Sequence, residues 1–181
     1  MGFGPPGLPR PFIVDGEPYT LTNPGGHILA GSVAAGNWYA VVPALVDEPG
    51  RARLLGRLSD VNDPLTLKWL WRIATGTLAE AVGLPWHVQV RLCATVHAKW
   101  VWFDGWCIRH GFSPRTEPYE RIVAAAHAWL AEASGKPDEW EKVERNLWTI
   151  PPGDALLIGD QTPPWLAAEE ARLFELAESL G

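Results

Sequence analysis

The stretch Trp86–Gly111, WHVQVRLCATVHAKWVWFDGWCIRHG, decides how this chain folds. Read as one helix at about 100° per residue, it places most of its apolar side chains on one broad stripe. The stripe consists of Trp86, Val90, Leu92, Cys93, Val96, Trp100, Val101, Phe103, Cys107 and Ile108. An apolar stripe of this width predicts a helix that packs against the core of a globular protein.

Two pairs of large apolar side chains lie outside the main stripes of their helices. Trp102 and Trp106 fall on the opposite side of the Trp86–Gly111 helix, and Trp69 and Ile73 form a similar pair on a predicted helix over 64–82. A second apolar face is covered either by neighbouring helices of the same chain or by a partner protein. Polar residues on the side of Trp102 and Trp106 are Arg91, Thr95, Lys99 and Arg109. The candidate partner-binding residues are Trp69, Ile73, Arg91, Lys99, Trp102 and Trp106.

Composition excludes several classes of function. The 181 residues are 47% hydrophobic and 20% charged, a globular balance that fits one domain. Residues 137–181 carry three basic and ten acidic side chains, which argues against binding to nucleic acid. The chain has no apolar run of about 18 residues, so we expect no membrane span. Self-association remains open, because exposed tryptophans would also serve contacts between copies.

Apolar periodicity and turn residues along the chain predict a mainly α fold, a single helical domain of about five main helices with a small N-terminal β-hairpin. The domain boundaries are an extended Gly/Pro-rich arm over 1–11, a helical domain over 12–160 and an acidic C-terminal helix over 161–181. Asp15-Gly16 predicts a type I′ turn in the hairpin, and Asp63-Pro64 predicts the start of a helix. The predicted helices are His27–Ala35, Trp38–Val46, Arg51–Leu58, 64–82, Trp86–Gly111, 119–134, Pro137–Trp148 and Trp165–Leu180.

No motif for catalysis or cofactor binding is present in the sequence. Phosphate loops, dinucleotide fingerprints, His-Glu-x-x-His helices and nucleophile elbows are all missing. Cys93 with His97, and Cys107 with His110, have the spacing of metal ligands on a helix. On an unbroken helix the two pairs stand too far apart for one ion, unless Gly105 breaks it sharply. We therefore expect no enzyme, no cofactor and no metal site, and two buried free cysteines.

Several short motifs follow one another in an order and spacing that cover most of the chain. They are GFGPPG at residues 2–7 with the hairpin, Asp60-Val-Asn-Asp63-Pro-Leu65, Gly83-Leu-Pro-Trp86-His-Val-Gln-Val-Arg91-Leu92, Trp100, the Tyr119–Leu130 helix and Ile150-Pro-Pro-Gly153. In this arrangement the chain resembles the small tail assembly chaperones of long-tailed bacteriophages of high-GC hosts.

The resemblance implies a morphogenetic role without chemistry. Chaperones of this family bind the long helical tape measure protein and recruit tail tube subunits. They act in the host cytoplasm and are absent from the mature virion. The apolar faces fit this role, because a chaperone for an amphipathic helix needs an apolar surface bordered by charge.

Two other functions are compatible with the same residues. A structural virion component, such as a tail-completion or connector subunit, would use the tryptophans in permanent contacts. A small metal-binding protein would use the Cys/His pairs.

Overall fold

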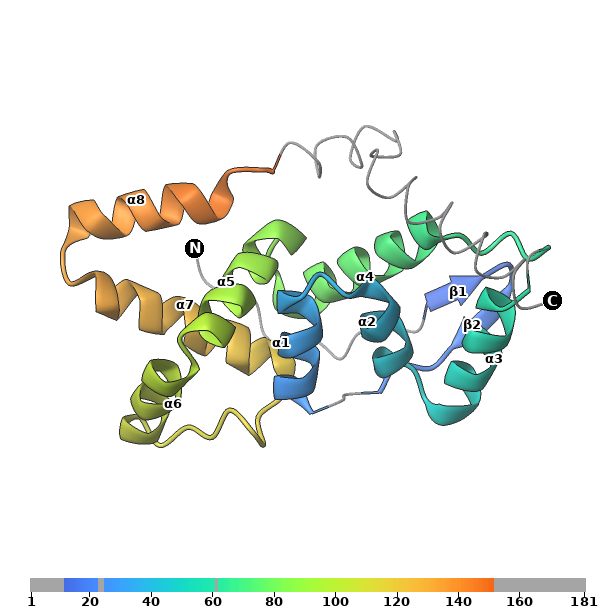
Figure 1. Cartoon of the computed structure of the whole chain (residues 1–181), viewed down its shortest axis with the longest axis horizontal. Helices are drawn as coiled ribbons and strands as arrows, with labels where there is room; N and C mark the ends of the chain where they lie inside the picture. The colour runs from blue at the N-terminus through green and yellow to red at the C-terminus, as the bar shows by residue number, and fades with distance from the viewer. Residues whose placement is uncertain (1–11, 23–24, 61, 152–181) are drawn as a thin grey trace.

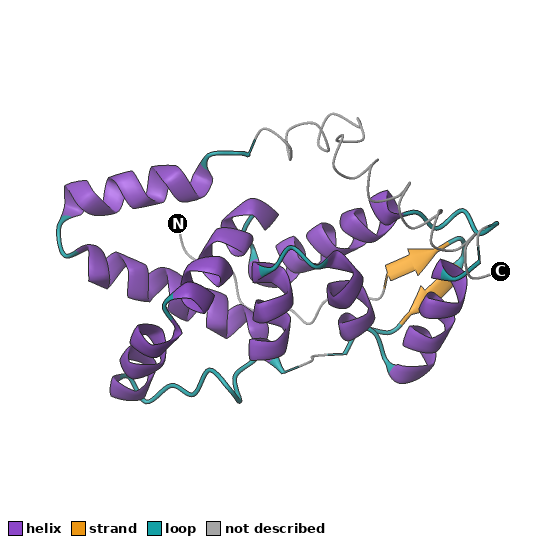
Figure 2. Ribbon diagram, in the orientation of Figure 1, coloured by secondary structure: helices purple, strands orange, loops and turns teal. Residues whose placement is uncertain are grey.

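The structure is a computed structural model that describes residues 12–22, 25–60 and 62–151. Within these residues the fold is mainly helical with an N-terminal hairpin, as predicted (Figures 1 and 2). The elements are β1 Phe12–Val14, β2 Glu17–Tyr19, α1 Gly26–Ala34, α2 Trp38–Leu45, α3 Glu48–Leu58, α4 Leu67–Val82, α5 Trp86–Ala98, α6 Trp100–Arg109, α7 Tyr119–Ser134 and α8 Pro137–Trp148. None of the described helices is long and apolar enough to cross a membrane. The predicted arm over 1–11 and the helix over 161–181 lie outside the described residues.

The hairpin forms as predicted. Asp15 and Gly16 have φ angles of 50° and 84°, the left-handed conformations that a type I′ turn requires. Tyr19 is fully buried and stacks on Phe12, with the ring centroids 5.1 Å apart. A bridge between Leu21 and Val46 then joins the hairpin to the end of α2, so the two strands do not stand alone.

Helix α5 is the centre of the fold. It contacts α1, α4, α6, α7 and α8, and α1 crosses both α5 and α7 (Figure 1). The side chains of His87, Val88 and Cys93 are buried on different sides of α5. A helix covered on so many sides needs the broad apolar stripe that the sequence shows.

The predicted helix over Trp86–Gly111 is two helices. Lys99 has φ −123° and ψ 32°, outside the helical range, and it separates α5 from α6. Gly105, where a kink was expected, lies inside α6. Because α6 is a separate helix, its contacts with α7 decide which of its sides is covered. Beyond Lys99 the predicted stripe is correct for Phe103 and Cys107, which are buried, and wrong for Val101 and Ile108, which are exposed.

The predicted helix start at Asp63-Pro64 is also wrong. Helix α4 begins at Leu67, and Thr66 is its N-cap, accepting a hydrogen bond from the Trp69 N–H. The Asp63 carboxylate instead accepts from the Leu65 N–H and pairs with Arg57. The end of α4 is as predicted, at Gly83 with φ 73°.

A buried hydrogen-bond network joins α4, α5 and α7. The Gln89 amide NH₂ donates to the carbonyls of Leu78 and Leu84, at 3.1 and 2.7 Å. The Tyr119 hydroxyl donates to the Gln89 amide oxygen at 3.0 Å. Gln89 and Tyr119 are both buried, so each bond satisfies a polar group that water cannot reach.

Gly26 permits a close contact between α1 and the start of α7, and this contact yields the first prediction. A Cβ at this position would lie 2.5 Å from the Glu117 carbonyl oxygen and 2.6 Å from the Tyr119 nitrogen, both backbone atoms. We expect Gly26→Ala to lower the free energy of unfolding by about 1–3 kcal/mol, because α1 must move away from the start of α7. Urea unfolding followed by circular dichroism measures the change.

Gly31→Ala is the matched control in the same helix. Nothing lies within 4 Å of a Cβ at Gly31, so this substitution should be neutral or stabilising by up to about 1 kcal/mol. Equal losses in both variants would contradict the proposed contact.

Candidate protein-binding surface

One side of α6 is apolar and uncovered. Val101, Trp102 and Ile108 are 81%, 74% and 69% exposed, respectively. At helical spacing they surround Gly105, and the exposed Arg109 lies two turns after Trp102 on the same side. We call these five residues the α6 face. Exposed apolar side chains gathered on one helix face are typical of a protein-binding surface.

The other side of α6 is anchored in the core. Phe103, Trp106 and Cys107 are buried, and the Phe103 ring meets the edge of Trp129 with the centroids 5.5 Å apart. The Trp106 indole N–H donates to the Glu132 carboxylate on α7 at 2.7 Å. The α6 face is therefore presented by a helix whose opposite side is fixed by packing against α7.

The structure separates the predicted pair Trp102 and Trp106. Trp102 is exposed as predicted, whereas Trp106 is only 8% exposed and stacks on His110 at 4.1 Å. Val101 and Ile108, assigned to the core stripe, are exposed instead. These corrections follow from the break at Lys99, after which α6 packs against α7. Lysine is a good helix former, so no signal in the sequence marks this break.

Arg91 does not border Trp102, contrary to the sequence interpretation. Its guanidinium donates to the carbonyls of Leu147 and Thr149, at 3.0 and 2.6 Å, and also to that of Asn146. These carbonyls belong to the C-terminal end of α8, where carbonyl groups lack partners and the helix dipole favours a cation. Arg91 thus caps α8. Lys99 is exposed at the break, next to the α6 face.

Trp69 and Ile73 do not form a joint exposed face. Trp69 is 53% exposed, with the Arg72 guanidinium 5.5 Å from its ring centroid. Ile73 is half-buried and packs against the core. The prediction of an exposed position holds for Trp69 and fails for Ile73, because α4 packs on α2 and α5 as well as α7.

A groove of about 480 Å³ lies beside α6, between α4 and α7. Its floor contains Ala81, Ala124, Ala125 and Ala128, and Trp106, His110 and Phe112 line the side toward α6. No pattern in the sequence indicates the groove, because its walls come from three separate helices and a loop.

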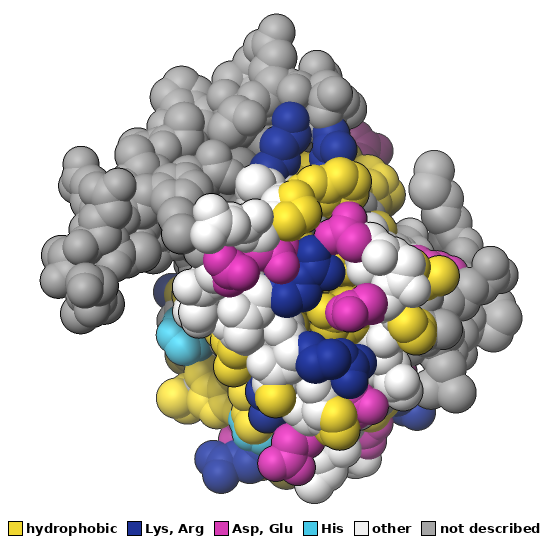
Figure 3. All heavy atoms as spheres, turned by 90° about the vertical axis from the view of Figure 1, so that its right-hand side faces the viewer, with side chains coloured by type: hydrophobic (Ala, Val, Ile, Leu, Met, Phe, Trp, Pro, Cys, Tyr) yellow, Lys and Arg dark blue, Asp and Glu magenta, His cyan; other side chains and the backbone are white. Residues whose placement is uncertain are grey.

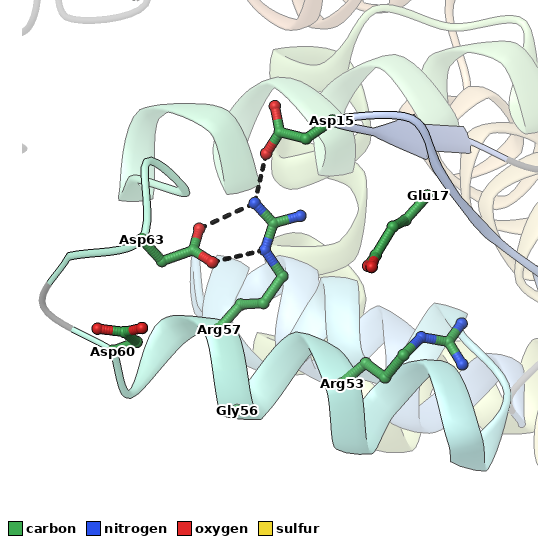
Figure 4. A pocket seen from close by; sticks show the side chains of 7 residues that line it. All are labelled: Asp15, Glu17, Arg53, Gly56, Arg57, Asp60 and Asp63. Atoms are coloured by element: carbon green, nitrogen blue, oxygen red, sulfur yellow. Dashed lines mark hydrogen bonds and ion pairs between the residues drawn. The ribbon is translucent and has the colours of Figure 1, made fainter.

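A charged pocket of about 500 Å³ is lined by residues of the hairpin, α3 and the segment before α4 (Figure 4). The hairpin and α3 lie at the opposite end of the molecule from α6 (Figure 1). Arg57 donates to both carboxylate oxygens of Asp63, at 2.8 and 2.9 Å, and also to Asp15. This guanidinium lowers the pKa of Asp63. Figure 3 shows acidic and basic side chains intermixed over this end. Arg57 ties the hairpin turn to the segment before α4 through these two ion pairs, so we assign the pocket a structural role.

The two cysteines are buried and free, as predicted. Burial raises the pKa of Cys93 to about 12 and that of Cys107 to about 11, so both thiols are protonated at neutral pH. Metal ions are bound by thiolates rather than thiols. In the part of the chain that the structure describes, no three His, Cys, Asp or Glu side chains gather as metal ligands would.

No protein-family model matches this chain, and neither does any curated protein or solved structure. The α6 face and the sequence motifs are therefore the features from which we infer a function.

The opposite environments of Trp102 and Trp106 yield the second prediction. Trp106→Ala removes buried apolar volume and the bond to Glu132, so we expect it to cost about 3–5 kcal/mol of unfolding free energy. Trp102→Ala removes surface that the described residues leave exposed, so it should cost less than about 1.5 kcal/mol. Urea unfolding of both variants measures the difference, and equal losses would contradict the assignment of the α6 face.

The Arg57–Asp63 pair yields the third prediction, on pH. A carboxylate whose pKa is lowered in the folded state contributes stability above its ordinary pKa of about 3.9. That contribution disappears as pH falls through the lowered value. We expect Asp63→Asn to be less stable than the parent at pH 7, with the difference shrinking as pH drops below about 4.

Glu17→Gln is the control for charge removal in the same pocket. Among the described residues Glu17 has no ion pair, so the same loss of charge should leave stability nearly unchanged. Urea unfolding at pH 7 and at pH 3 tests both variants.

Proposed function

We propose that this chain is a non-enzymatic assembly chaperone that binds a long helical partner protein through the α6 face. The observation that carries the proposal is the exposure of Val101, Trp102 and Ile108 on one side of an anchored helix. Trp and Arg, both present on this face, are the residues most enriched in interface hot spots.

A helix is the partner that this surface fits best. Gly105 lies in the middle of the α6 face, and nothing lies within 4 Å of its would-be Cβ. The missing side chain leaves room for another helix to approach closely, as small residues do at helix contacts. Lys99 and Arg109 border the apolar side chains, so acidic residues beside the apolar stripe of the partner would be favoured.

The size of the surface suggests how a long partner would be covered. Ten residues make α6 about 15 Å long, which spans only about three turns of a partner helix. Many copies of the chain would therefore bind side by side along one long helix. The bound copies would shield the apolar stripe of the partner helix from water and from the apolar stripes of other partner molecules.

The resemblance to tail assembly chaperones supplies the identity of the partner in this proposal. The long helix is a tape measure protein, and the coated complex recruits tail tube protein in the host cytoplasm. The chaperone then leaves before the virion is complete. Neither nucleic acid nor a membrane takes part.

The fourth prediction tests the proposal by co-expression with a tape measure protein. We expect Trp102→Ala combined with Ile108→Ala to weaken binding more than tenfold, since a hot-spot truncation costs about 2 kcal/mol or more. Trp69→Ala is the matched control, an exposed tryptophan on another helix, and should bind normally. Pull-down and the soluble fraction of the partner are the readouts.

Circular dichroism of each variant ensures that lost binding is not lost folding. Full solubilisation of the partner by the Trp102/Ile108 variant would contradict the proposal. Detection of the chain in purified virions by mass spectrometry would instead favour the structural virion component.

A further inference from the structure

We propose that, when no partner is bound, the C-terminal segment 165–180 of the same chain covers the α6 face. The sequence predicts a helix here with one apolar side. That side contains Trp165, Leu166, Leu173, Leu176, Ala177 and Leu180. The segment thus has the shape and chemistry that the α6 face accepts from a partner helix.

Charge favours this segment as the occupant. Residues 152–181 contain six carboxylates and one arginine, a net charge of −5, while the whole chain carries −6. The charged residues on α6 and at its start are Lys99, Arg109 and the half-buried Asp104. His97 and His110 flank them on either side. An acidic apolar helix is therefore attracted to the α6 face, and the attraction also orients it.

The segment can reach the α6 face. The described chain ends at Pro151, just after Thr149, whose carbonyl is bound by Arg91 in the middle of α5. The start of α6 is nine residues after Arg91, which corresponds to a distance of about 14 Å along a helix. The thirteen residues between Pro151 and Trp165 span up to about 45 Å when extended. The extended linker is therefore much longer than the distance from Arg91 to the start of α6.

A second copy of the chain is a poorer occupant. Specific interfaces between proteins use roughly 20–30 residues on each side, and the α6 face supplies five. If two copies paired through their α6 faces, the cations Lys99 and Arg109 of one copy would also approach Lys99 and Arg109 of the other. A tethered segment needs less contact area, because a short flexible linker gives an effective concentration in the millimolar range.

Docking of the segment has a regulatory consequence that rests on the proposed function. The segment and the partner helix compete for one surface, so the apolar residues stay shielded until the partner arrives. If the segment is docked nine-tenths of the time, the apparent affinity for the partner falls about tenfold.

The fifth prediction tests docking in the full chain without any partner. Protein labelled with 5-fluorotryptophan is examined by ¹⁹F NMR, and the Trp102 resonance is assigned by its loss in Trp102→Phe. The difference in its chemical shift between H₂O and D₂O reports its contact with solvent. We expect Leu173→Asp with Leu176→Asp to increase this difference at Trp102 and to leave the Trp69 resonance unchanged.

Leu156→Asp with Leu157→Asp is the matched control, with the same change of charge outside the predicted helix, and should leave Trp102 shielded. A Trp102 resonance with full solvent response in the parent chain would overturn the proposal. A response that varies with protein concentration would also overturn it, in favour of a second copy. This experiment contains no partner, so its failure would count against docking of the segment and not against the proposed function, which the partner-binding experiment tests separately.

Discussion

The buried amide of Gln89 is the interaction on which the arrangement of the helices depends. Its NH₂ group binds two carbonyls at the end of α4, and its oxygen accepts from Tyr119 at the start of α7. Because these groups are shut off from water, a helix that moves leaves a polar group unpaired at a cost of about 1–3 kcal/mol. Apolar packing alone would allow α5 to slide or rotate, whereas this network admits one position.

The position of α5 determines that of α6. Once α5 ends at Lys99, Phe103 and Trp106 reach α7, where Trp129 and Glu132 hold them. The remaining side of α6 then has no neighbour in the described part of the chain. The exposed apolar surface is thus a consequence of how the core is completed, and the same tryptophan-rich helix serves packing on one side and binding on the other.

The distribution of charge along the chain also distinguishes the binding side of α6 from the rest of the molecule. At the hairpin end, Arg57 forms ion pairs with both Asp15 and Asp63. The acidic excess of the chain lies after residue 151, and cations border the α6 face. A helix with carboxylates beside an apolar stripe complements that face, whether it comes from a partner or from the end of the same chain.

The sequence by itself determined the features that depend on neighbouring residues. Asp15-Gly16 predicted the turn, because few other residues accept positive φ, and Gly83 predicted the end of α4 for the same reason. The apolar stripe likewise predicted the buried side of α5. Only the tertiary structure decided where the long helix breaks, since Lys99 carries no local signal and the break lets α6 pack on α7. It also decided that Trp106 is buried, that Arg91 caps α8 and that Asp63 pairs with Arg57. Trp106 and Arg91 bind residues far away in the chain, and local propensity says nothing about such pairs. Asp63 and Arg57 are close in sequence, but their pairing depends on how the segment between α3 and α4 is folded.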